Sequence, residues 1–164
     1  MVFGGIPYYM GYVRKNLSFA QNVDQILFSK RALLGDEFDR LFESIFDNPE
    51  QIKAVVRMLF TKNAGYTRNE IINRLHLSNS GHLSKHLKAL ISSGFVTKYV
   101  PFGVSKKEEH YKLTDPFCLF YLHFLEGEGS LAGGRWEQIN NTQPAISWRG
   151  FAFENVCFNH IDDR

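Results

Sequence analysis

The chain of 164 residues lacks the features of several large protein classes. It has no uninterrupted run of about 18 apolar residues, the length that a membrane-spanning helix needs. Its opening, MVFGGIPYYMGYVRKN, does not have the charged-then-apolar order of a secretory signal. Its two cysteines, Cys118 and Cys157, have no CxxC spacing. We therefore expect a cytoplasmic protein with no membrane partner, whose thiols are reduced and pack in the core.

Motifs for phosphate binding and for catalysis are also missing. The sequence contains neither GxxxxGK[ST] nor GxGxxG, the two glycine-rich phosphate cradles. His82 and His86 stand four residues apart, a spacing that a zinc site can use, but no glutamate follows His82 and no carboxylate lies one turn away. Ser84 and His86 diverge on a helix and cannot act as nucleophile and base. We expect no catalytic residue, no metal and no cofactor in this chain, which is not predicted to be an enzyme by itself.

Charge is present but unevenly distributed. The net charge of the whole chain is +2, but its segments differ. Residues 1–48 contain five Lys/Arg and six Asp/Glu, a net charge of −1, and residues 114–164 contain three Lys/Arg and seven Asp/Glu, a net charge of −4. Residues 49–113 carry eleven Lys/Arg against four Asp/Glu, a net of +7. A basic segment between neutral and acidic flanks favours a polyanion as its partner.

Helical periodicity dominates the first third of the chain. Apolar residues at helical spacing predict a short helix over 20–31. Asp36 is a plausible N-cap for a second helix, which ends near Asn48, and Pro49 stands at the start of a third. The apolar positions of these two helices recur at i, i+3, i+4, i+7 and i+8: Phe38, Leu41, Phe42, Ile45 and Phe46, then Ile52, Val55, Val56, Leu59 and Phe60.

A more specific pattern follows from Gly65. Thr67 and Glu70 have the spacing of a capping box and predict a short helix over 68–75. Ser78 or Asn79 can cap the next helix, which runs to about residue 93 with its leucines inward. Two segments of strand character, 95–100 and 110–113, flank a polar turn. This order of three helices and a hairpin is typical of a winged helix-turn-helix, so we expect a mainly α fold with a small β-hairpin wing.

In a winged helix-turn-helix, the second helix of the motif lies in the major groove of DNA and the hairpin tip contacts phosphates. The outward residues of the predicted recognition helix and the basic residues of the hairpin tip are therefore the candidate DNA-binding residues. They are Asn79, Ser80, His82, Lys85, His86, Lys88, Lys106 and Lys107. The alternative is a solvated helix face with a wing that packs on a neighbouring domain, since Glu108 and Glu109 partly cancel the field of the wing lysines.

The sequence after the hairpin predicts further helices and a linker. A helix begins at Asp115-Pro116 and ends near Gly127, and an apolar helical pattern covers 146–161. Between them, GEGSLAGG over 127–134 predicts a linker or a mobile loop.

Several segments together resemble one known arrangement. They are GGIPYYM, Phe28-Ser29-Lys30, Asp36-Glu37-Phe38, the winged module, LTDPFCLFYLHFL and SWRGFAFENVCFNHI. Their order is similar to the C-terminal half of archaeal and bacterial AAA+/STAND-type ATPases, which join a P-loop domain to a winged helix and a restriction-endonuclease-like domain. The resemblance implies three parts: a helical lid remnant (1–48), a winged helix-turn-helix with a following helix (49–126), and a linker with the truncated start of a nuclease-like domain (127–164).

The same resemblance implies roles for particular residues. Gly5 and Pro7 correspond to the nucleotide-sensing element of the lid, whereas a helix-entry turn is the plainer interpretation. Glu154 is similar to the first-helix glutamate of PD-(D/E)xK nucleases, but the Asp and ExK of that motif are missing, and a metal needs several oxygen ligands. ATP and Mg²⁺ would belong to the parent protein, with a P-loop domain before Met1 and most of the nuclease-like domain after Arg164.

We therefore expect a non-catalytic, winged-helix DNA-binding or regulatory fragment of a larger P-loop ATPase. One alternative is a protein-interaction or intramolecular docking module that dimerises through an unpartnered apolar face (Phe151, Phe153, Val156 and Phe158). A second alternative is a small winged-helix transcription regulator, against which the acidic C-terminal segment argues.

Overall fold

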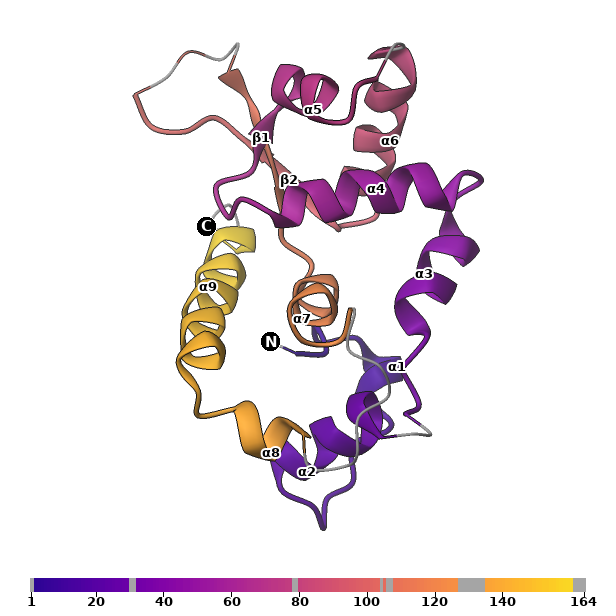
Figure 1. Cartoon of the computed structure of the whole chain (residues 1–164), viewed down its shortest axis with the longest axis vertical. Coiled ribbons are helices and arrows are strands. Elements are labelled where there is room, and N and C mark those ends of the chain that lie inside the picture. Colours follow the sequence, from indigo (N-terminus) through magenta and orange to yellow (C-terminus); the bar gives the residue numbers. More distant parts are fainter. Residues whose placement is uncertain are drawn as a thin grey trace. The chain divides into compact units, whose positions relative to one another are not determined.

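The computed structural model describes residues 2–29, 32–77, 80–103, 105, 108–126 and 135–160, with the backbone alone at Ser80 and Asn159. These residues form a mainly helical fold with a small three-stranded antiparallel sheet (Figure 1), which confirms the predicted class. The chain divides into two compact units. The first unit joins Met1–Ser44 to Pro116–Arg164, and the second unit is Ile45–Asp115.

Within its described residues, the first unit is helical. Its elements are α1 (Pro7–Met10), α2 (Phe19–Val23), the π-helix η1 (Asp24–Phe28), α3 (Glu37–Ile45), α7 (Pro116–Phe124), α8 (Arg135–Ile139) and α9 (Gln143–Asn159). The helix predicted over 20–31 is thus α2 continued by a π-turn. Ser18 caps it, since its hydroxyl accepts from the Gln21 backbone N–H at 3.2 Å while the Gln21 side chain accepts from the Ser18 N–H at 3.0 Å.

The core of the first unit is built from aromatic rings around α7. Phe120 is fully buried, and its ring centroid lies 5.1 Å from that of Trp136 on α8 and 5.2 Å from that of Trp148 on α9. On another side of α7, the Tyr121 ring stacks on Phe38 of α3 at 4.5 Å. The helix α7 therefore has partners on several sides, which explains why its sequence is apolar almost throughout.

A buried carboxylate holds α8 against this core. Asp24, in η1, accepts hydrogen bonds from the backbone N–H groups of Trp136 and Glu137 at 2.6 and 3.2 Å. These N–H groups belong to the first turn of α8, where no helical partner exists for them. Asp24 thus caps a helix that lies more than a hundred residues further along the chain.

The second unit contains the helices and the hairpin strands predicted for the winged module up to residue 113, together with one further short strand. They are α4 (Pro49–Phe60), β1 (Tyr66–Thr67), α5 (Arg68–Arg74), α6 (Ser80–Ser92), β2 (Val96–Tyr99) and β3 (His110–Leu113). The sheet has the order β1-β3-β2, with Tyr66 opposite Tyr111 and Val96 opposite Leu113. The wing is the β2–β3 hairpin, and β1 is an added strand that periodicity does not predict.

One glycine makes the short strand β1 possible. Gly65 has φ +72°, and a Cβ placed on it would lie 2.2 Å from the carbonyl oxygen of Tyr111 in β3. Any other residue would collide with the strand to which β1 pairs. Gly65 therefore fixes the approach of the α4–β1 loop to the sheet.

The observed units differ from the boundaries predicted at 48, 49, 126 and 127. The helix α7, assigned by the sequence to the winged module, belongs to the first unit together with α8 and α9. Its rings pack on Phe38, Trp136 and Trp148, so the segments before and after the second unit share one core. In the described part of the chain, no helix is both long and apolar enough to cross a membrane.

Candidate nucleic-acid interface

The helix α6 presents a polar face outward. Leu83, Leu87 and Leu90 are almost completely buried, because they are the apolar positions that pack into the core of the second unit. On the opposite side, the predicted residues His82, Lys85 and Lys88 are exposed, and His86 is half-buried at the edge. The four side chains therefore lie at the positions that the helical spacing predicts.

Other predicted DNA-binding residues are not placed. Asn79, Lys106 and Lys107 lie outside the described residues, and only the backbone of Ser80 is described, at the start of α6. Their proposed contacts with DNA remain predictions.

A basic cavity lies between α6 and the sheet. Its volume is about 240 Å³, and it is lined by Arg68, Ser84, Leu87, Lys88, Ile91, Ser92, Lys98 and Tyr111. Three of these side chains are cationic, and they come from three different elements, α5, α6 and β2. We call this set, Arg68, Lys88 and Lys98 with the hydroxyl of Ser84, the basic groove. Neither Arg68 nor Lys98 is among the residues predicted from the sequence.

Hydrogen bonds and charges organise the basic groove. The Nε of Arg68 donates to the Oγ of Ser84 at 3.2 Å, which joins the start of α5 to the middle of α6. The Nζ of Lys98 lies 3.0 Å from Oε1 of Glu109 on the other side of the wing. The hydrogen bond with Glu109, followed by its charge, raises the pKa of Lys98, so this lysine is fully cationic at neutral pH. Glu109 therefore offsets part of the positive charge of Lys98.

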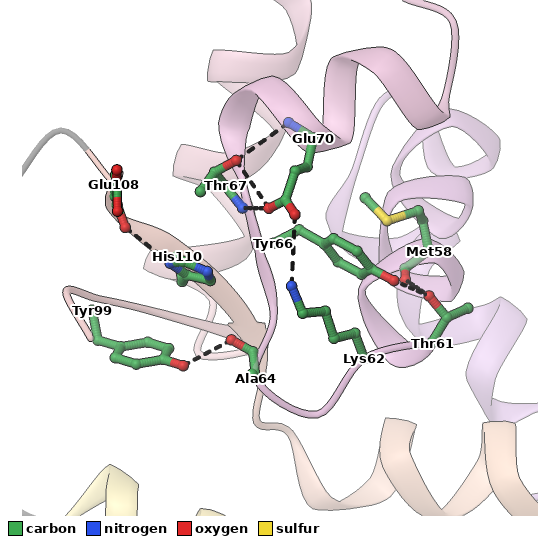
Figure 2. A network of polar contacts seen from close by, with 10 residues as sticks. All are labelled: Met58, Thr61, Lys62, Ala64, Tyr66, Thr67, Glu70, Tyr99, Glu108 and His110. Carbon is green, nitrogen blue, oxygen red and sulfur yellow. Dashed lines mark hydrogen bonds and ion pairs between the residues drawn. The ribbon is translucent and has the colours of Figure 1, made fainter. Parts of the chain in front are cut away.

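A capping box between Thr67 and Glu70 (Figure 2) fixes the start of α5, whose first residue is Arg68. The backbone N–H of Thr67 donates to Oε2 of Glu70 at 2.7 Å, and the Glu70 N–H donates to the Thr67 hydroxyl at 3.3 Å. The first of these bonds is the largest cause of the lowered pKa of Glu70, and the charge of Lys62 lowers that pKa further. The ionised carboxylate thus holds the start of α5 in one position.

The wing is tied to the same loop that precedes β1. The Tyr99 hydroxyl, at the end of β2, donates to the carbonyl of Ala64 at 2.7 Å. The Thr61 hydroxyl donates to the carbonyl of Met58 and lies 2.7 Å from the hydroxyl of Tyr66 (Figure 2). Arg68 and Lys98 are therefore carried by elements that share one anchored loop.

The second unit carries a net positive charge. Residues 45–115 carry eleven Lys/Arg against six Asp/Glu, a net of +5. Arg68, Lys88 and Lys98 concentrate part of this charge around a single cavity. A concave surface lined by one sign of charge attracts a counter-charge more strongly than the same groups spread over a surface.

The residues that the family resemblance links to a nucleotide or a metal belong to the first unit. Gly5 has φ +71° and Pro7 is the first residue of α1, so the two form a helix-entry turn whose contact with a nucleotide stays a prediction. Glu154 is exposed on α9. Over the described ranges, no three His, Cys, Asp or Glu side chains come together in a way that could hold a metal ion.

Comparisons of the chain with protein-family models, with curated proteins and with solved structures find no match.

Proposed function

We propose that the second unit binds double-stranded DNA, with the outward face of α6 in the major groove and a backbone phosphate in the basic groove. The observation that carries this proposal is the convergence of Arg68, Lys88 and Lys98 around one cavity beside α6. Cations from three elements can surround a phosphate from several sides, which a row of lysines on one helix cannot do.

The basic groove and the outward face of α6 would have different roles in the recognition of DNA. Arg68 offers a planar guanidinium, which binds phosphate oxygens through paired hydrogen bonds, and Lys98 supplies a point charge. Such contacts position a protein on the duplex without reading its sequence. His82 and Lys85 of α6 are exposed and able to donate to acceptors on base edges, such as guanine N7 and O6.

Binding is tested by the fluorescence anisotropy of a labelled 20-base-pair duplex at low salt. We expect Arg68→Ala and Lys98→Ala each to weaken binding at least about threefold, since each removes a phosphate contact. Lys15→Ala is the matched control, because it removes one exposed positive charge from the first unit. A wild-type chain that does not bind the duplex at low salt contradicts the proposal.

A second candidate function is docking to another protein through α9. Ile146 and Phe153 are 46% and 63% exposed, and their spacing of seven residues places them on one face of the helix. Light scattering over a range of concentrations tests self-association. If Phe153→Ser shifts a dimer to a monomer, docking between copies is supported; a wild-type monomer at all concentrations contradicts dimerisation.

The likeness to AAA+/STAND-type ATPases extends the main proposal to a larger protein in the cytoplasm. In such a protein, ATP and Mg²⁺ would bind outside this chain, with Gly5 and Pro7 near the nucleotide. The reading frame upstream of Met1 tests this extension, since it predicts a P-loop there. An upstream frame without a P-loop leaves DNA binding by the second unit as the whole proposal.

A further inference from the structure

A second cavity lies on the other flank of α6, within the second unit. Its volume is about 410 Å³. It is lined by Gln51, Ala54 and Val55 of α4, by Leu75 and Leu77 after α5, and by His82, Leu83 and His86 of α6. Figure 1 shows these three helices gathered in one part of the fold. We call this cavity the α4–α6 pocket.

The lining of the α4–α6 pocket combines an apolar floor with two imidazoles. Three leucines, a valine and an alanine supply the floor, and His82 and His86 stand one helical turn apart beside it. A cavity of this size, apolar with a few polar groups, is typical of small-molecule sites. It is too small for a folded partner and too apolar for a nucleotide phosphate.

The charge of the lining selects the kind of ligand. Every ionisable group in the described lining is an imidazole, so protonation gives the pocket a positive charge that no lining carboxylate offsets. Gln51 adds an amide that can donate a hydrogen bond. An anion with an apolar body fits both features, whereas a cation would meet repulsion.

We propose that the α4–α6 pocket binds a small apolar carboxylate, whose aromatic or aliphatic body lies on the leucines and whose carboxylate faces His82 and His86. The two histidines also belong to the α6 face that is proposed to meet DNA. A ligand that binds these histidines lowers the affinity of the chain for DNA, and DNA lowers the affinity for the ligand by the same factor. This coupling rests on the proposed function, but binding of the carboxylate does not.

The pH dependence follows from the same groups. Burial is the main cause of the lowered pKa of His86, and the charge of His82 lowers it further. A bound carboxylate favours the charged imidazole and raises that pKa again. Affinity for the carboxylate should therefore increase as the pH falls from about 8 to about 5.5. The described lining residues of α4 and of the α5–α6 turn do not titrate, so the change comes from the imidazoles.

The probe is 2-naphthoate, with 2-naphthamide as its uncharged match, titrated into the full chain without DNA. NMR of the histidine rings gives the affinity and the pKa of each imidazole. At pH 6 we expect naphthoate to bind at least about tenfold more tightly than naphthamide and to raise the pKa of His86, because a hydrogen bond to a charged group is the stronger kind. The rings of His110 and His123, which do not line the pocket, should not respond.

Two variants separate the imidazoles from the cavity. The double variant His82→Gln/His86→Gln should abolish the preference for naphthoate over naphthamide while keeping the apolar floor. Ala54→Phe should fill the cavity and exclude both probes, with both imidazoles still present. Equal binding of the two probes to the wild type, or no response of His82 and His86, overturns the carboxylate site.

A DNA titration of the same samples tests the coupling. Near-saturating naphthoate should lower the affinity for the duplex at least about fivefold, and naphthamide should not. If naphthoate binds in the pocket and DNA affinity is unchanged, the coupling is wrong and the site stands. If the chain binds no DNA at all, the proposed function fails, and the NMR titration still decides the site.

Discussion

Substitution of Gly65 by alanine should destabilise the second unit selectively. At φ +72°, a residue with a Cβ pays about 1–2 kcal/mol for the left-handed conformation. The Cβ would also lie 2.2 Å from the Tyr111 carbonyl oxygen and 2.7 Å from its carbon, which are backbone atoms of β3 and cannot rotate away. Relief of such a clash costs about 1–3 kcal/mol more. The free energy of unfolding should fall by roughly 2–5 kcal/mol.

Gly94→Ala is the control for this substitution. Gly94 has φ +76°, and a Cβ placed there meets nothing within 4 Å, so it carries the conformational cost without the collision. Amide hydrogen exchange over residues 45–115 should be accelerated about 5- to 150-fold more by Gly65→Ala than by Gly94→Ala, which corresponds to the clash term of about 1–3 kcal/mol. Thermal unfolding of this unit should shift by about 10 °C or more in the first variant. Equal effects of the two substitutions would refute the argument from close approach to β3.

Three further predictions concern single polar groups. Thr67→Ala removes the cap of α5 and should cost about 1 kcal/mol of stability; the lost hydroxyl also donates to Oε2 of Glu70 at 3.0 Å and, after the backbone N–H that stays, helps to lower the pKa of Glu70, so this part of the difference from wild type, followed by urea unfolding, should be present above pH 4.5 and be lost as the pH falls through the folded pKa. Asp24→Ala leaves two N–H groups of α8 without their acceptor and should cost about 1–3 kcal/mol, measured by calorimetry; Asp24→Asn, which keeps one acceptor oxygen, should cost less, and an Ala variant as stable as wild type contradicts the cap. Glu109→Gln removes the carboxylate that pairs with Lys98 and should strengthen DNA binding about twofold or more, whereas unchanged or weaker binding by anisotropy would place Lys98 outside the interface.

Periodicity predicts the helices of the second unit well because one buried face determines each of them. Leu83, Leu87 and Leu90 recur at helical spacing, and all three are buried. The same reasoning could not find β1, because a strand of two residues is too short to show a periodic pattern of apolar residues. The only local hint in the sequence is the glycine at position 65, which adopts a left-handed conformation in the structure. It also could not assign α7, because a helix that is apolar almost throughout does not indicate which neighbours surround it.

Only the part of the candidate site that lies on a single helix can be predicted from the sequence. Outward positions on α6 follow from spacing along one helix, so His82 and Lys88 could be named from the sequence. Arg68 and Lys98 reach the basic groove only through the register of β2 with β3 and the capped start of α5. Contacts between distant segments, such as Asp24 with the first turn of α8, leave no local pattern at all.

DNA binding through the basic groove is tested most directly by the salt dependence of affinity for one duplex. For each phosphate that the protein neutralises, the slope of log affinity against log salt concentration is about −0.9. Arg68→Ala and Lys98→Ala should each make the slope shallower by about 1, and Lys15→Ala should leave it unchanged. Slopes that are identical in all three variants, or a wild-type affinity that does not depend on salt, would contradict a phosphate in the basic groove.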